Sequence, residues 1–392
     1  MSIEITENEL NQAFEDLKAG EFSAITVVVG ASIEEKPELL EKAAEIISSS
    51  IDPTNWNNYE KEFEALVLAG FDNNKIFKQF EKIFVRKDMA AFSQYIADLV
   101  ARYLSVHSTR VIDLELYISS HAAQNSPAFY DYVIQALYAQ LQIDMHTDKF
   151  SDIEAAFVRF VDFEPQVTLF KVNELMKQSF IELTSVLRDE SGEKMGNGSF
   201  FNRIHLWSNF AFRSESFTQA YVTIIVHALR AKSLKLNPLR IKLIQVLVDH
   251  NEFLAPLTSC AKVLLKSRSH KTGEAVEFEF DNLYLSTKEI GRTQKYQDEV
   301  YNRSFDLLKK CLFGLRNRIA FPEIAAPIVR SLEMMIADDT YKQNVKQLTK
   351  FKDAIKENAT WIERAREKAV QKDGFNIIEN TEIEGTAPFK IK

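Results

Sequence analysis

Hydrophobic residues recur along most of the chain every three to four positions, the spacing that an α-helix places on one face. The clearest stripe consists of Phe92, Tyr95, Ile96, Leu99, Val100, Tyr103 and Leu104. Polar residues separate these positions, so an amphipathic helix is predicted here. The same spacing predicts helices over residues 59–69, 76–84, 129–141, 167–187, 221–229, 239–247, 254–264, 307–319, 324–336 and 339–372.

Glycine and proline mark the ends of several predicted helices. Gly70 and Gly374 follow helical stretches that they can terminate, whereas Pro127 can occupy a first helical turn. Pro327 lies five residues after Pro322, so the helix there either kinks at Pro327 or begins at it. The chain has only 11 glycines and 9 prolines, well below the average of about 7% and 5%. This scarcity favours long helices over strands.

Four stretches depart from the helical pattern. Ile25–Val29 is β-prone and ends at Gly30, although a lone strand there would have no evident partner. Residues 191–198 hold three glycines and predict a surface loop, the best internal boundary. Alternating residues in 269–282 predict an irregular segment that crosses the helices, and the tail from residue 379 is expected to lie against the surface or to be loose.

The resulting fold prediction is all-α, an α-solenoid of HEAT/armadillo-like antiparallel helix pairs. No residue recurs at a fixed period, so the repeat rests on element lengths and short connections, and a compact helical bundle is the alternative. The predicted regions are an acidic helical region over 1–165, a helical-repeat region over 166–372 and a tail over 373–392.

Charge is divided unevenly along the chain. The net charge is −8, but residues 1–200 hold 17 Lys and Arg against 33 Asp and Glu, and residues 201–392 hold 31 against 23. Residues 201–272 alone contain 11 basic and three acidic side chains. A field of that sign attracts phosphate or an acidic protein surface, whereas a solvated helical face is the alternative. The candidate partner or RNA contacts are Arg230, Lys232, Lys235, Arg240, Lys242, Lys262, Lys266, Arg268 and Lys271.

Motifs for catalysis and cofactor binding are missing from the sequence. The glycines at 192, 196 and 198 lack the Lys-Ser/Thr of a phosphate-binding loop, and the seven histidines are scattered without metal-ligand spacing. Cys260 and Cys311 lie on apolar helical stretches and are expected to be buried, in a reducing compartment. Aromatic residues from Phe200 to Phe212 are expected in the core or as a seat for a partner helix. We therefore expect no enzyme activity, cofactor or metal.

The N-terminal sequence lacks the features of a secretory signal, and the apolar run 22–31 is too short to cross a bilayer. An intracellular protein without membrane association is expected.

Five segments, in order, resemble the nucleolar complex protein two family. They are residues 237–247 (NPLRIKLIQVL), 253–257 (FLAPL), 278–280 (FEF), 319–332 (IAFPEIAAPIVRSL) and 356–366 (KENATWIERAR). The resemblance covers about residues 168–392 and includes the Thr386-Ala-Pro-Phe389 sequence near the end.

That resemblance implies a non-enzymatic helical-repeat scaffold for assembly of the large (60S) ribosomal subunit. Its implied partners are a sister nucleolar complex protein, number one or three, and the proteins and precursor rRNA of pre-ribosomal particles. The implied location is the nucleolus and nucleus. The chain contains no lysine-rich import signal, so import is expected to depend on the partner. The alternative is a cytosolic helical-repeat adaptor of a transport or regulatory complex.

Overall fold

A computed structural model describes residues 5–32, 37–70, 73–84, 86–103, 127–145, 147, 150–163, 165–189, 193–266, 276–338, 344–373, 382–383 and 385–390. Within these ranges the regular elements are helices, apart from one isolated β-bridge between Arg318 and Glu382. The all-α prediction is therefore confirmed. The chain divides into two compact units, Met1–Lys177 and Gln178–Lys392. The division falls within helix α10 (Pro165–Leu187) rather than in the loop 191–198.

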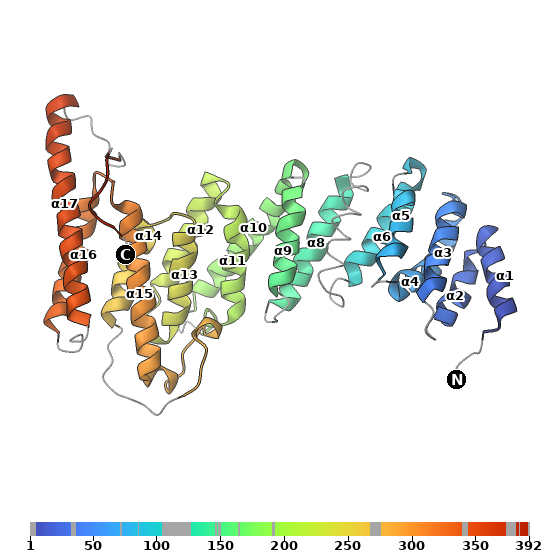
Figure 1. Cartoon of the computed structure of the whole chain (residues 1–392), viewed down its shortest axis with the longest axis horizontal. Helices are drawn as coiled ribbons and strands as arrows, with labels where there is room; N and C mark the ends of the chain where they lie inside the picture. Colours follow the sequence, from blue (N-terminus) through green and yellow to red (C-terminus); the bar gives the residue numbers. More distant parts are fainter. Residues whose placement is uncertain are drawn as a thin grey trace. The chain divides into compact units, whose positions relative to one another are not determined.

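The first unit is built around packed aromatic rings. The Phe63 ring lies 5.3 Å from that of Phe22 and 5.0 Å from that of Phe92, and all three side chains are fully buried. Its helices, shown in blue to green in Figure 1, are α1 (Glu7–Lys18), α2 (Ile25–Ser32), α3 (Pro37–Ser50), α4 (Glu60–Ala69), α5 (Asn74–Phe84), α6 (Ala90–Tyr103), α8 (Pro127–Asp144) and α9 (Phe150–Phe163). The stripes predicted at 59–69 and 76–84 thus lie on helices, and so does the predicted stripe 92–104 as far as Tyr103, the last described residue there.

The β-prone prediction for Ile25–Val29 was wrong, because these residues form most of α2. Ile25 and Val28 are completely buried, and α2 packs against α1, α3 and α4. The preference of a β-branched residue for a strand over a helix is worth less than about 1 kcal/mol. The free energy gained when this short apolar helix is buried against three neighbours outweighs that preference.

The second unit contains the helices after α10. They are α11 (Gly198–Ala211), α12 (Glu215–Leu229), α13 (Asn237–Asp249), α14 (Leu254–Lys266), α15 (Gln294–Leu315), α16 (Phe321–Ala337) and α17 (Val345–Asp373). α16 begins at Phe321 and continues through Pro327, so a start at Pro327 is excluded. The predicted end of α17 at Gly374 lies outside the described residues. Phe200, Trp207 and Phe210 are buried, as expected for core residues.

A strap, defined as residues 276–293, precedes α15 and crosses helices of the unit. The backbone N–H of Ser286 donates to the Lys235 carbonyl at 2.8 Å. Tyr284 lies against Gly198, where an added Cβ would come within 3.0 Å of its ring. Within the stretch 269–282, the Asp281 carbonyl accepts from Lys242 of α13, and the Phe280 ring lies 5.9 Å from that of Tyr296 of α15. The described part of this stretch therefore crosses the helices as predicted, while residues 269–275 lie outside the described residues.

The C-terminal tail is packed onto α15 and α17. The buried Asn358 donates through Nδ2 to the Arg316 carbonyl at 2.8 Å and accepts from the Phe389 N–H at 3.4 Å. The Phe389 ring lies 5.9 Å from the ring of Phe351. Of the two alternatives for the tail, the described residues 382–383 and 385–390 thus favour docking against the helices.

Cys260 on α14 and Cys311 on α15 are both buried, as predicted. Burial, reinforced by a hydrogen bond with Cys311, holds the pKa of the Cys260 thiol well above its usual range. A thiol kept protonated in this way is a poor nucleophile. Among the described helices, none combines the length and apolar character needed to span a bilayer.

The tail contact predicts a stability effect. Phe389 is 3% exposed, so Phe389→Ala is expected to lower the free energy of unfolding by about 3 kcal/mol through a core-type cavity. Urea unfolding of the full chain measures this, with the exposed neighbour Lys390→Ala as the control. Equal midpoints for the two variants would contradict the proposed contribution of the tail.

Candidate functional site

Arg240 is the predicted contact residue that the structure contradicts. Its side chain is 6% exposed, and it donates to Asn237 Oδ1 at 2.6 Å and to the Ala231 carbonyl. Burial lowers the pKa of the guanidinium from its usual value. Arg240 therefore holds the connection between α12 and α13 against the start of α13, and it is not available to a ligand.

Lys242 also has an internal role. Its Nζ donates to the Asp281 carbonyl and lies 4.0 Å from the centroid of the Tyr284 ring. Burial lowers the pKa of Lys242 to about 8, Asp281 opposes that shift, and Arg303 adds to it. These contacts attach the strap to α13, so the main role of Lys242 is structural.

The remaining predicted residues separate into two groups. Arg230, Lys232 and Lys235 are exposed in and beside the connection between α12 and α13, whereas Lys262 is exposed by itself on α14. The side chain of Lys266 and the residues Arg268 and Lys271 lie outside what the structure describes. A role of these exposed side chains in binding stays a prediction.

The strap adds two basic residues that sequence reasoning missed. The Ser286 hydrogen bond to Lys235 brings the exposed Lys288 and Arg292 to the same end of the unit as the α12–α13 connection. Glu289 lies between them and offsets part of their charge. We define the basic edge as Arg230, Lys232, Lys235, Lys288 and Arg292. More than 50 positions separate Lys235 from Lys288, and no spacing signal in the sequence connects them.

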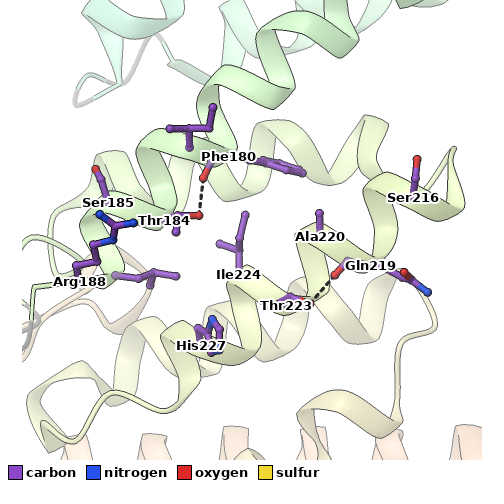
Figure 2. Close-up of a pocket in the computed structure, with 12 residues that line it drawn as sticks. Phe180, Thr184, Ser185, Arg188, Ser216, Gln219, Ala220, Thr223, Ile224 and His227 are labelled. Atoms are coloured by element: carbon purple, nitrogen blue, oxygen red, sulfur yellow. Dashed lines mark hydrogen bonds between the residues drawn. The ribbon is translucent and has the colours of Figure 1, made fainter.

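A groove of about 790 Å³ lies between α10 and α12 in the second unit. The buried side chains Phe180 and Ile224 form its floor. Outward-facing positions of the two helices form its walls, and Arg188 and His227 lie toward one end, away from Ser216 (Figure 2).

The walls of the groove expose few free polar groups. The hydroxyls of Thr184 and Thr223 donate to the carbonyls of Phe180 and Gln219 on their own helices, both at 2.7 Å (Figure 2). The Ser185 hydroxyl donates to the Glu182 carbonyl at 2.7 Å. Hydroxyls that are satisfied within a helix leave the groove between its two ends uncharged and largely apolar.

A second cavity of about 460 Å³ is lined by α11, α13, α15 and the strap. Three of its charged residues contact one another: Arg303 donates to Asp281 at 2.5 and 3.2 Å, and Lys242 contacts the same residue. In the described part of the chain, no three His, Cys, Asp or Glu side chains are placed to hold a metal ion. The contacts of Lys242 and Arg303 with Asp281 hold the strap against α13 and α15.

The helical fold, the basic edge and the neutral groove place the chain in the class of all-α proteins with exposed candidate interaction surfaces. The Noc2p family model matches residues 176–381, more than half of the 392 residues. The chain belongs to the Noc2p family, which confirms the resemblance carried by the sequence segments and assigns a role in ribosome biogenesis. A comparison with curated proteins found no match.

The internal role of Lys242 predicts a dependence of stability on pH. Its pKa is about 8 in the folded chain against 10.5 for an unperturbed lysine, so the unfolded chain binds more protons between these values. As pH increases from about 7 to about 10, the free energy of unfolding of the wild-type chain should therefore rise relative to that of Lys242→Met. Urea unfolding of both proteins measures the difference, and a difference independent of pH would contradict the depressed pKa.

Proposed function

We propose that this protein is a non-enzymatic scaffold in the assembly of the large ribosomal subunit. It acts in the nucleolus on pre-ribosomal particles, as a heterodimer with a sister nucleolar complex protein. The observation that carries this proposal is the match to the Noc2p family over residues 176–381. That range extends from the second half of α10 through α17, and so it includes both the groove and the basic edge.

The proposal includes a solenoid arrangement of helix pairs within each unit. In the first unit, α1 packs on α3 and α3 on α5, while α2 packs on α4 and α4 on α6. In the second unit, α11 packs on α13 and α13 on α15, while α12 packs on α14 and α14 on α16. Contacts between alternate helices are typical of stacked helical hairpins, in which two layers of helices run side by side.

The basic edge is the part of the scaffold that contacts RNA of the particle. Its five cationic side chains are exposed, and none of them forms an ion pair within the described residues. α13 and α15 begin beside it, at Asn237 and Gln294, so the positive ends of two helix dipoles add to the field. Phosphate binding at such a surface depends on charge and not on base sequence.

Affinity purification tests the scaffold itself. The tagged full chain is expected to co-purify with large-subunit precursor proteins and with a second helical-repeat protein, and to concentrate in the nucleolus. Mass spectrometry and fluorescence microscopy measure these outcomes, with the tag alone as the control. Exclusion from the nucleolus together with the absence of precursor proteins would overturn the proposal and favour a cytosolic adaptor.

Charge reversal tests the basic edge. Lys232→Glu, Lys235→Glu and Lys288→Glu together are expected to weaken binding of the purified chain to single-stranded RNA. They should also flatten the dependence of log affinity on log salt by about 2 if all three contact phosphate. The charge-matched control is Lys346→Glu, Lys350→Glu and Lys368→Glu, three exposed lysines on α17. Equal losses in both triple variants, measured by fluorescence anisotropy, would contradict a localised RNA site.

A further inference from the structure

We propose that the groove between α10 and α12 binds one amphipathic helix of a partner protein, antiparallel to both helices, with acidic side chains in the first turn of that helix. The inference deepens the proposed function, because it assigns a surface and a chemistry to the protein partner of the scaffold. It rests on the make-up of the groove and the direction of its two helices.

The groove is depleted in charge. Twelve described residues line it, and Arg188 and His227 are the only basic ones among them, while none is acidic. Asp, Glu, Lys and Arg make up 27% of the whole chain, so about three would be expected among twelve positions, whereas Arg188 is the one such residue in the lining. Depletion of charge at the centre of a patch distinguishes protein interfaces from ordinary surface.

Two outward-facing rows form the walls. On α10 the exposed positions are Ile181, Thr184, Ser185 and Arg188, spaced as one helical face, and on α12 they are Ser216, Gln219, Ala220, Thr223 and His227. Ile181 is 73% exposed, so its apolar side chain is available for contact with a partner in this groove. The hydroxyls of Thr184, Ser185 and Thr223 already donate to carbonyls of their own helices, so they need no hydrogen bond from a ligand.

The two helices run in the same direction. The Phe180 ring lies 6.3 Å from that of Phe217 and 6.0 Å from that of Tyr221, early in α12. The later residues Arg188 and His227 lie toward the other end of the groove (Figure 2). The space between two parallel helices accepts a third helix, whose side chains fill the groove.

The direction and charge of the bound helix follow from that arrangement. α10 and α12 both end beside Arg188 and His227, so the negative ends of both dipoles lie there. A helix in the opposite direction places its positive N-terminus at this end. Acidic side chains in its first turn would stabilise that N-terminus and contact Arg188 and His227.

A second copy of this chain fits the groove less well. Two grooves placed face to face would leave the space between them unfilled, because each is hollow. A helix from a partner protein fills the groove, and its apolar stripe covers Ile181, Ala220 and Ile224.

Site-specific photo-crosslinking tests the occupant and its direction. A photoreactive amino acid is placed at Ser185 or at Ser216 of the full chain in cells, and the crosslinked peptides are sequenced. Both positions are expected to crosslink to one helical segment of one partner. The site reached from Ser185 should lie N-terminal to the site reached from Ser216, because the bound helix is antiparallel to α10 and α12.

Each other crosslinking outcome overturns the inference. The reverse order of sites contradicts the antiparallel direction. Crosslinks to this same chain identify a second copy, crosslinks to RNA identify a nucleic-acid surface, and the absence of any protein crosslink shows that the groove is not occupied.

A matched pair of substitutions supplies the second measurement. Ile181→Glu is expected to reduce co-purification of the crosslinked partner at least tenfold, and Arg188→Glu with His227→Glu should also reduce it. Met334→Glu is the control, since Met334 is an exposed apolar residue on α16 with 60% exposure. Thermal unfolding should be unchanged in all of these variants, because the substituted side chains are exposed.

The result separates the two proposals. Retention of the partner by Ile181→Glu would overturn the groove assignment and leave the scaffold proposal intact. Absence of large-subunit precursor proteins from the wild-type purification would overturn the scaffold proposal, whatever the groove binds.

Discussion

Burial of one apolar face per helix is the constraint on which this structure depends. Most of its helices have 10 to 18 residues, and helices of that length are marginal in water without tertiary packing. Each unit satisfies the constraint by packing neighbours together, as the ring contacts of Phe63 and the buried Trp207 illustrate. Packing therefore fixes which face of every helix points outward, and the outward faces and helix ends are what remains for binding.

One of the two candidate surfaces lies at helix ends, and the other lies on outward helix faces. The basic edge is assembled at helix ends by a connection and the strap, which a hydrogen bond from Ser286 to Lys235 holds together. The groove is assembled from outward positions of α10 and α12. Arg240 and Lys242 contribute to the first surface without belonging to it, because their internal bonds set the connection and the strap in place.

Sequence periodicity predicted most helices, because a stripe such as Phe92–Leu104 has only one structure that buries it. The prediction was wrong for Ile25–Val29, where a short β-branched run suits a strand or a buried helix equally and only its neighbours decide. The site was less predictable. Charge type does not distinguish the buried Arg240 from the exposed Lys235, and Lys288 joins the basic edge through a contact that is distant in sequence.

The groove and the basic edge influence each other because they meet at one end of the second unit. His227 lines the groove, and Arg230 belongs to the edge three residues later, at the end of α12. Charges this close interact within the Debye length of about 8 Å at physiological salt. An acidic helix terminus beside His227 would offset part of the field that attracts phosphate, and phosphate on the edge would weaken the helix contact by the same free energy. If the proposed helix and RNA both bind at this end, their binding would therefore be coupled, and more strongly so at low ionic strength.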